Sequence, residues 1–486
     1  MKKTISMLLL CAMLTSLAAC GNGTTSETES QTPAAESETV TDTVETEPMP
    51  ELPQRDFEGY TYRILSTEDT NKFICAAEST GEVVNDAVYA SNAAVGEQFN
   101  ITFTTIPITS NSDATIIQSY IMAGEDAYDV AQLHDCTSGS MALNGWFHNV
   151  YEIPYVDTTK PWWPQFTVDS LTLNGKMYLI SNYTTYRAMH ETRVAFFNRD
   201  MIEDMAMESP YDLVREGTWT VDKIASMTKD VYVDVNGDGK QDKGDTMGFT
   251  FTSAPYCWLE SFGVETYQKV SPDSAELVLN ANTEVVVNLV DKLYNWLCQK
   301  DSSIWCKMGN TREEAMEMFA SGSCLFTFKC IGDQLPYLME TDMNYGIVPF
   351  PKLEESVQDY VSACTDLLLT IPVTAGDMER TGMITEAMSY YGWKLILPAY
   401  CETALKNRYS TDKESAEMLD LIFQNRTISF AYLFVNMGPG MQLRLLIDTI
   451  GQNKSDVASY YAKNEQKELS VMEKVTAFYG DGTTAK

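Results

Sequence analysis

The most constraining feature of this sequence is an alternation of strand and helix patterns between residues 60 and 133. Residues 60–65, 101–106 and 128–133 carry apolar side chains in the patterns of β-strands. Residues 85–99 and 114–122, which lie between them, have helical spacing. Strands that alternate with helices predict an α/β fold, in which a parallel sheet is covered by helices.

The same kind of pattern continues along the chain. Strands and helices are mixed over residues 185–214, a helix is expected over 285–298, and short strands are expected over 324–328 and 345–348. A helix-rich tail begins at Met378, and no internal repeat is found. With 486 residues, the chain is long enough for two domains with substantial cores.

The N-terminus has the pattern of an export signal. Two lysines precede a short apolar run, and Leu17-Ala18-Ala19-Cys20 is similar to the lipobox of bacterial lipoproteins. We therefore expect a signal peptide over residues 1–19 and a lipid on Cys20; the alternative is an unmodified cysteine near an ordinary cleavage site. Residues 20–52 are rich in Ser, Thr and acidic residues, which predicts a disordered tether. These features predict an extracytoplasmic protein anchored to the cell membrane.

The charge of the chain restricts its partners. It has 34 basic and 68 acidic residues, a net charge of −34. Binding to nucleic acid requires clustered Lys and Arg, so a nucleic-acid partner is not expected. Nine cysteines follow Cys20, and an odd number cannot all pair within one chain. They show no CxxC spacing, and no disulfide can be assigned.

Several short motifs carry a resemblance to a known family when they are taken in order. They are residues 173–178 (LNGKMY), 194–200 (VAFFNRD), 217–220 (GTWT), 319–323 (FASGS) and 344–349 (NYGIVP). Their order resembles that of the extracellular solute-binding proteins of ABC importers, family 1, in the carbohydrate-binding branch that includes maltose-binding protein. The similarity spans most of residues 55–400.

The resemblance implies a periplasmic-binding-protein-like α/β fold, in which two lobes built from discontinuous segments enclose a ligand cleft. Lobe 1 would comprise residues 53–187 and 358–398, and lobe 2 residues 188–357 and 399–486. It implies a non-enzymatic, monomeric protein that captures a carbohydrate by lobe closure and presents it to ABC permease subunits. Which solute and which permease remain open.

Candidate ligand-binding residues follow from the chemistry of sugars, whose hydroxyl groups need carboxylates or amides and whose ring faces need aromatic side chains. His134 and Asp135 follow a predicted strand, at the strand end where open α/β sheets place ligands. The resemblance implies that Asp135 and Glu191 accept sugar hydroxyls and that Tyr256 stacks on the ring, with Trp258 nearby. The alternatives are a helix cap for a carboxylate and a core position for an aromatic residue.

Trp162 and Trp163 are adjacent, and in a strand they would face opposite sides. At most one of them would then reach a ligand, and packing within a lobe is the preferred interpretation for both.

Residues 234–245 have the spacing of a calcium loop. The expected ligands are oxygen atoms of Asp234, Asn236, Asp238, Lys240 (through its carbonyl), Asp242 and Asp245. Gly239 allows the sharp turn, and the loop resembles the dockerin variant. The alternative is a solvated Asn-Gly-Asp-Gly turn. Nothing in the sequence indicates an open coordination position, so a bound calcium ion would be structural.

Two other functions compete with solute binding. The many carboxylates could include the acid/base pair of a glycosidase, and an acidic, tethered protein could adhere to a surface polysaccharide. The chain has only three histidines and lacks the H-E-x-x-H, G-x-S-x-G and Walker A motifs. We therefore favour solute binding over catalysis.

Overall fold

The computed structural model describes residues 48–251, 254–307, 312–405 and 413–481. The predicted signal peptide, Cys20 and nearly all of the predicted tether lie outside these residues. The described residues from Met49 to Asp481 belong to one compact unit. Among the described residues, no helix combines the length and the apolar character that crossing a membrane requires.

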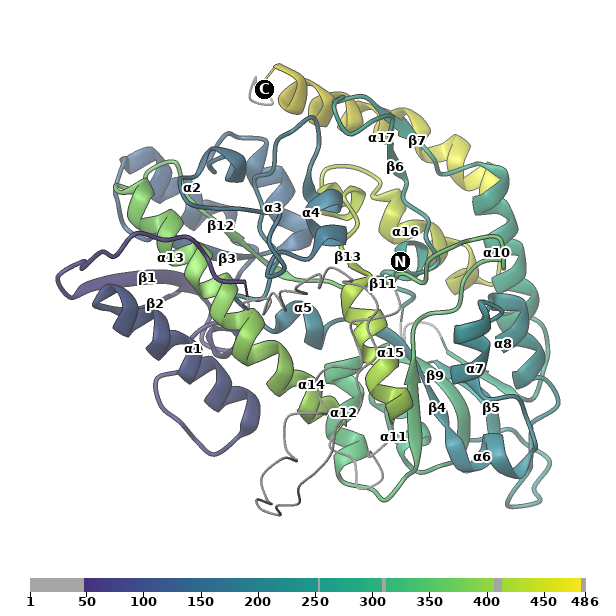
Figure 1. The fold of residues 1–486 in the computed structure, drawn as a ribbon. Helices are drawn as coiled ribbons and strands as arrows, with labels where there is room; N and C mark the ends of the chain where they lie inside the picture. Colours follow the sequence, from purple (N-terminus) through teal and green to yellow (C-terminus); the bar gives the residue numbers. More distant parts are fainter. Residues whose placement is uncertain (1–47, 252–253, 308–311, 406–412, 482–486) are drawn as a thin grey trace, which may run out of the picture. The chain divides into compact units, whose positions relative to one another are not determined.

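The first sheet has four strands in the order β12-β3-β1-β2. They are β1 (Tyr60–Ser66), β2 (Ile101–Pro107), β3 (Val130–His134) and β12 (Leu367–Thr370). β1 pairs in parallel with β2 and β3, whereas β12 is antiparallel to β3. Figure 1 shows β12, in green, beside β3, in blue, although more than 200 residues separate them in the sequence.

Helix α1 (Val83–Phe99) connects β1 to β2, and α2 (Ala114–Ala123) connects β2 to β3. The Glu82 side chain accepts hydrogen bonds from two backbone N–H groups at the start of α1, and Asn100 ends this helix in the left-handed conformation. The predicted strands and helices of this region are confirmed. β3 begins two residues later than predicted, because the Asp129 carboxylate instead takes up the Arg63 backbone N–H (2.7 Å).

The second sheet has five strands in the order β10-β4-β9-β5-β8. They are β4 (Arg193–Asn198), β5 (Met247–Phe251), β8 (Ile304–Cys306), β9 (Cys324–Cys330) and β10 (Tyr345–Val348). β4 is antiparallel to both of its neighbours, and β5 is parallel to β8 and β9. The expected strands over 324–328 and 345–348 are confirmed, and both sheets are mixed rather than purely parallel.

Three short extended segments lie side by side, and two of them, near residues 192 and 364, run between strands of the two sheets. β11 (Ser362–Ala363) pairs in parallel with β13 (Arg426–Thr427). Thr192, just before β4, forms a bridge with Cys364. We call these three stretches the crossing segments. They place residues near 192, 364 and 427 next to one another, and the site lies against them.

The remaining elements are mostly helices that cover the sheets. They are η1 (Asn71–Phe73), α3 (Asp135–Ala142), η2 (Val150–Glu152), α4 (Gln165–Leu171), α5 (Arg187–His190), α6 (Arg199–Asp204), α7 (Pro210–Glu216), α8 (Val221–Thr228), α9 (Trp258–Ser261), β6 (Tyr267–Lys269), β7 (Leu277–Leu279), α10 (Glu284–Leu297), α11 (Arg312–Ala320), α12 (Ile331–Met339), α13 (Met378–Tyr391), η3 (Gly392–Ile396), α14 (Leu397–Leu405), α15 (Lys413–Gln424), η4 (Ala431–Phe434), α16 (Met441–Asp448), η5 (Ile450–Gln452) and α17 (Val457–Asp481). The predicted helix over 285–298 and the helix-rich tail are confirmed.

Trp162 and Trp163 are buried, which confirms the packing interpretation. The expectation that they face opposite sides is wrong, because they lie in turns and not in a strand. Both indole N–H groups donate to the carboxylate of Glu386 on α13, at 2.6 and 2.9 Å. Neither tryptophan lines the cavity described below.

The buried apolar side chains form two main clusters. One contains Ile64 and Leu133 of the first sheet together with Phe196 of the second, and the other contains Phe249 and Phe326 of the second sheet. All nine cysteines within the described residues are free thiols, in agreement with the absence of an assignable disulfide.

Candidate functional site

A cavity of about 210 Å³ lies where the crossing segments meet the ends of strands from both sheets. It is lined by His134, Arg187, Glu191, Arg193, Phe251, Ala254, Tyr256, Trp258, Phe328, Lys329, Cys330, Asp333, Thr365, Phe350 and Tyr432. Only His134 belongs to a strand of the first sheet. Arg193, Phe251 and Lys329 come from β4, β5 and β9 of the second sheet. The lining is therefore assembled from distant parts of the chain.

Glu191 precedes β4 and is almost buried. Its Oε1 lies 2.8 Å from Nη2 of Arg187 and 3.4 Å from Nδ1 of His190, and its Oε2 accepts a hydrogen bond from the Cys330 thiol at 3.6 Å. The His190 contact has ion-pair distance but not the geometry of a hydrogen bond, so Arg187 is the stronger partner. Burial alone would raise the pKa of Glu191; His190, Arg187 and Arg193 outweigh this effect and lower the pKa to about 2.

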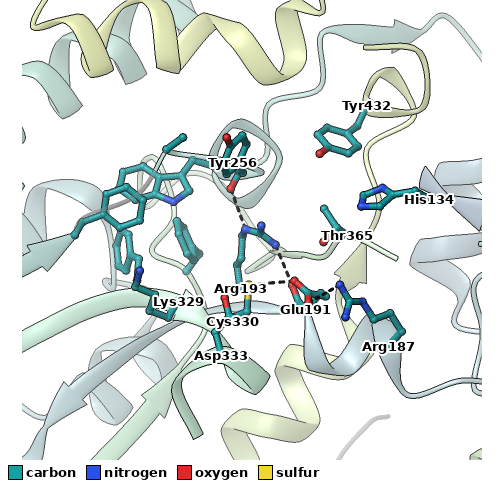
Figure 2. A pocket seen from close by; sticks show the side chains of 15 residues that line it. His134, Arg187, Glu191, Arg193, Tyr256, Lys329, Cys330, Asp333, Thr365 and Tyr432 are labelled. Carbon is teal, nitrogen blue, oxygen red and sulfur yellow. Dashed lines mark hydrogen bonds and ion pairs between the residues drawn. The ribbon is translucent and has the colours of Figure 1, made fainter. Parts of the chain in front are cut away.

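Arg193, the first residue of β4, ties together two parts of the lining. Its Nε donates to the carbonyl oxygen of Tyr256 (2.9 Å), and its Nη1 donates to the carbonyl oxygen of Glu191 (3.0 Å). Figure 2 shows Arg193 held between Tyr256 and Glu191, with Arg187 on the other side of Glu191. The two hydrogen bonds fix the guanidinium group in the wall of the cavity.

An aromatic cluster forms another part of the lining. The Trp258 ring contacts the rings of Phe251 and Phe328, with centroid distances of 4.5 and 5.3 Å, and Phe328 packs on Phe350 at 4.2 Å. Trp258 is 2% exposed, whereas Tyr256 is 36% exposed. The cluster therefore supplies a buried apolar floor, and Tyr256 is the aromatic ring more accessible to a ligand.

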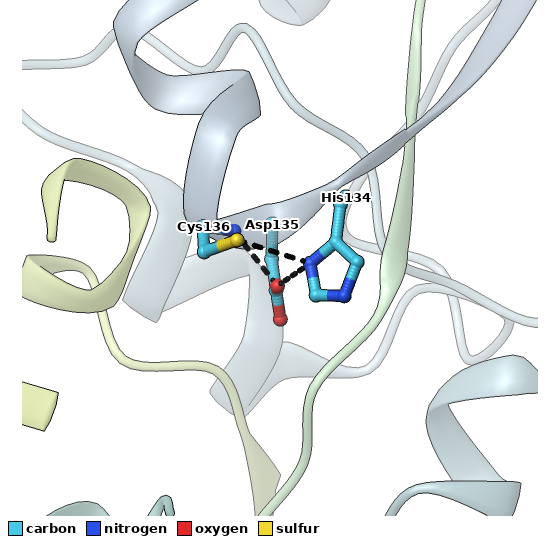
Figure 3. A group of neighbouring side chains, drawn as sticks. All are labelled: His134, Asp135 and Cys136. Atoms are coloured by element: carbon cyan, nitrogen blue, oxygen red, sulfur yellow. Dashed lines mark hydrogen bonds and ion pairs between the residues drawn. The ribbon is translucent and has the colours of Figure 1, made fainter. Parts of the chain in front are cut away.

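His134, Asp135 and Cys136 form a tight group at the C-terminal end of β3. His134 Nδ1 lies 2.7 Å from Oδ1 of Asp135 and 3.3 Å from the Cys136 sulfur (Figure 3). The hydrogen bond to Asp135, followed by that to Cys136, raises the pKa of His134 to about 10 against the opposing effect of burial. These donor atoms lie within 4.8 Å of one another and engage each other, so we interpret the group as one that orients the imidazole ring.

Four of the five predicted ligand residues line this cavity: His134, Glu191, Tyr256 and Trp258. Asp135 does not. It is 0% exposed, and its Oδ2 accepts the backbone N–H of Asp366 at 2.8 Å, while its Oδ1 accepts that of Cys136. Asp135 thus lies behind His134. Direct binding of a solute by any of the five residues stays a prediction.

The charged residues Arg187, Arg193, Lys329 and Asp333 were not anticipated. Arg193 lies directly before the motif at 194–200, and Lys329 directly follows the expected strand at 324–328. Basic residues at strand ends are usually solvated, so nothing in the sequence pattern distinguishes Arg193 or Lys329 as a ligand-binding residue.

The predicted calcium loop forms a compact series of turns. Asp234 accepts the backbone N–H groups of Gly237 and Gly239, at 2.7 and 2.8 Å, and Asp245 accepts those of Val235 and Asp242, at 3.1 and 2.9 Å. Asn236, Asp238 and Asp242 each accept a backbone N–H two residues further on. The Lys240 carbonyl accepts the Tyr232 hydroxyl at 3.2 Å. Within the described residues, no three carboxylates of this loop have oxygen atoms that all lie within 4.8 Å of one another.

No protein-family model matches this chain, and no curated protein matches it. Solved structures do match. The alignment with UgpB from Mycobacterium tuberculosis in complex with glycerophosphocholine covers 86% of this chain and 98% of UgpB, with 14% sequence identity and a TM-score of 0.51.

The chain shares the fold of UgpB. Two further structures have TM-scores below 0.5 at 14% identity. The maltose/maltodextrin-binding domain MalE from Bdellovibrio bacteriovorus bound to maltotriose has a TM-score of 0.48, over 87% of this chain and 99% of that one. The ABC substrate-binding protein Lmo0181 from Listeria monocytogenes in complex with cycloalternan has a TM-score of 0.46, over 88% and 100%.

The periplasmic-binding-protein-like fold expected from the sequence is thereby confirmed. The exact residue boundaries of the two lobes stay a prediction. Within this fold, the cavity lies beside the crossing segments and takes residues from both sheets.

Proposed function

We propose that this protein is a lipid-anchored solute-binding protein that captures a saccharide and presents it to the permease subunits of an ABC importer. The observation that carries the proposal is the cavity at the crossing segments, which has charged side chains on an aromatic floor. The fold shared with UgpB, whose structure holds the small polar molecule glycerophosphocholine, supports the same class of ligand.

The lining matches what a sugar ring needs. Ring hydroxyls pair with charged hydrogen-bonding groups, and ring faces pack on aromatic side chains. In the cavity, Arg193 and His134 offer N–H groups, and Tyr256 offers a partly exposed ring. The volume of about 210 Å³ is below the roughly 300–1,000 Å³ of pockets for drug-sized ligands, so a short saccharide fits better than a long chain.

Lobe closure is the proposed capture mechanism. Within the described residues we assign the crossing segments as the hinge region, since the stretches at Thr192 and at β11 each run between strands of the two sheets through a few extended residues and β13 pairs with β11. A ligand that contacts His134 from one sheet and Arg193 from the other would favour the closed arrangement, because both sets of contacts form only when the lobes meet.

A thermal-shift screen of the full chain, extracted in mild detergent, tests the binding step. A saccharide that binds only the folded protein raises the melting temperature in proportion to its concentration. Mass spectrometry of the recovered sugar then separates binding from catalysis: the solute-binding proposal expects the sugar unchanged, and release of reducing ends would indicate a glycosidase.

Deletion of the gene tests the transport step. We expect loss of uptake of the bound sugar with normal growth on other carbon sources. Retained uptake with lost binding of cells to a polysaccharide would indicate adhesion instead. A Cys20→Ala substitution should release the protein from the membrane fraction if Cys20 carries the lipid.

We further propose that the loop at residues 234–245 binds one structural calcium ion. The oxygen atoms of Asp234, Asn236, Asp238, Asp242 and Asp245 and the Lys240 carbonyl provide the hard ligands that calcium prefers. Calcium would draw the carboxylates closer together and offset their mutual repulsion.

The calcium proposal predicts that chelator lowers the melting temperature and that added calcium restores it. Asp234→Asn should abolish this response, whereas Asp273→Asn, an exposed position outside the loop, should retain it. A melting temperature of the unaltered chain that does not respond to chelator would refute calcium binding.

A further inference from the structure

The cavity reverses the charge balance of the chain. Acidic residues outnumber basic ones by 68 to 34 in the whole sequence. Among the lining residues, the basic side chains of Arg187, Arg193 and Lys329 outnumber the acidic ones of Glu191 and Asp333. Since the rest of the chain is strongly acidic, this concentration of cations requires an explanation other than overall composition.

One acidic group of the lining is already engaged. Both oxygens of the Glu191 carboxylate have partners within the protein, and Arg187 lies 2.8 Å from one of them. Glu191 and Arg187 therefore largely neutralise each other. This pair adds little net charge to the cavity.

Arg193 is different, because both of its hydrogen bonds go to neutral carbonyl oxygens. Throughout the part of the chain that the structure describes, no carboxylate oxygen lies within 4.0 Å of its guanidinium nitrogens. A guanidinium group held by carbonyls keeps its full positive charge and presents its remaining N–H groups to a ligand.

Two further basic side chains line the same cavity. The Lys329 ammonium group lies 5.3 Å from the centroid of the Phe251 ring, within the lining. His134 has its Nδ1 engaged by Asp135, so its Nε2 is the nitrogen left to face a ligand. In Figure 2, Thr365 lies between Arg193 and His134, and both basic side chains border the same opening.

We propose that the natural ligand is an acidic saccharide, whose anionic group binds at Arg193 with support from Lys329 and His134. This inference rests on the proposed function and narrows its substrate class. Ring hydroxyls and an anionic substituent on the same molecule would use the polar and the cationic groups of one cavity. The anionic group is a carboxylate, as in a uronic acid, or a phosphate, as in a sugar phosphate.

Isothermal titration of the full chain with matched sugars tests the proposal. The panel pairs glucose, galactose and mannose with the corresponding uronic acids and 6-phosphates. We expect at least one acidic member to bind about tenfold to a hundredfold more tightly than its neutral partner, because charge-assisted hydrogen bonds are stronger than neutral ones. Tighter binding of the uronic acids or of the 6-phosphates shows which anionic group the cavity recognises.

Two variants test which side chains of the cavity cause the preference for an acidic sugar. Lys329→Met keeps a long, mostly apolar side chain in β9, and His134→Gln changes a side chain that is 38% exposed and therefore does not disturb the core. Both should lower the ratio of the affinity for the acidic sugar to that for its neutral partner about tenfold, because each removes a group that the anionic substituent uses. Lys454→Met, at an exposed position, removes the same charge outside the cavity and should leave both affinities unchanged.

The outcomes separate the two proposals. Neutral sugars that bind as tightly as their acidic partners would overturn the acidic ligand and leave the solute-binding function intact. Failure of every member of the panel to bind would overturn both. An acidic preference that survives in Lys329→Met and His134→Gln would place the anionic group elsewhere and overturn the proposed site.

Discussion

The Glu191 carboxylate provides the sharpest test of the geometry at the crossing segments. Glu191→Gln keeps the shape of the side chain but removes the negative charge beside Arg187 and His190. The folded-state pKa of about 2, against 4.5 for an unperturbed glutamate, is equivalent to about 3 kcal/mol at about 1.4 kcal/mol per pKa unit. The side chain is 11% exposed, so screening by solvent reduces this value only modestly.

The direction in which the Glu191 pKa is shifted determines how its contribution to stability depends on pH. Because the pKa of Glu191 is lower in the folded protein, the stabilisation is fully present above pH 4.5 and is lost as the pH falls toward 2. We therefore expect Glu191→Gln to unfold at a lower urea concentration than the unaltered chain at pH 7. Its free energy of unfolding should be lower by about 3 kcal/mol. The difference should shrink steadily between pH 4.5 and pH 2.

Urea denaturation followed by tryptophan fluorescence at pH 3, 5 and 7 measures this difference. Glu203→Gln, on the exposed side of helix α6, is the matched control and should follow the unaltered chain at every pH. Equal stability of Glu191→Gln and the unaltered chain at pH 7 would refute the reasoning. A difference that grows on acidification would contradict the assigned sign.

Three further predictions concern positions around the site and in the core. The raised pKa of His134, about 10 against 6.5, means that its stabilisation is complete below pH 6.5 and is lost as the pH rises toward 10. The difference in melting temperature between the unaltered chain and His134→Gln should therefore narrow between pH 6.5 and pH 10. Burial raises the pKa of Glu386 to about 7, so the stability of the unaltered chain should fall between pH 4.5 and 7, and Glu386→Gln should flatten this fall in a urea titration. A Cβ at Gly139 would lie 2.5 Å from the backbone oxygen of Leu433 in η4, next to the lining residue Tyr432, so Gly139→Ala should lower both the stability of the protein and its ligand affinity. The control is Gly248→Ala, whose Cβ would lie 2.1 Å from the backbone oxygen of Thr228. Since Gly248 does not line the cavity, this substitution should lower stability alone.

Much of the fold could be predicted from the sequence where elements are long and periodic. The strands of residues 60–65 and 101–106 and the helices between and after them have regular apolar spacing, and they form where expected. β11 and β13 were not predicted. Each has two residues, which is too short for any period, and their pairing depends on contacts between distant parts of the chain.

The residues of the candidate site could likewise be predicted from the sequence only in part. His134 could be selected because it ends a predicted strand, and ligands of open α/β sheets bind at such ends. The resemblance implies that its neighbour Asp135 accepts sugar hydroxyls, yet the backbone N–H of Asp366 occupies one of the Asp135 oxygens. That contact depends on a crossing segment whose position the sequence does not reveal. Arg193 was missed for a related reason, since a basic residue at the start of a strand is solvated unless other segments enclose it.

The net negative charge of the chain repels an anionic ligand, whereas the basic side chains of the cavity attract it. Which effect dominates depends on the distance between the ligand and the protein. At physiological ionic strength the screening length is about 8 Å, so the net charge of −34 acts weakly on a sugar that is still far from the protein. Inside the cavity the ligand contacts Arg193 directly, in surroundings that screen charge less than water does. Repulsion therefore slows the approach mainly at low salt, while attraction governs the bound state. Added salt should thus raise the association rate of an acidic sugar toward that of its neutral partner, and the preference for the acidic sugar should reside in a slower dissociation rate.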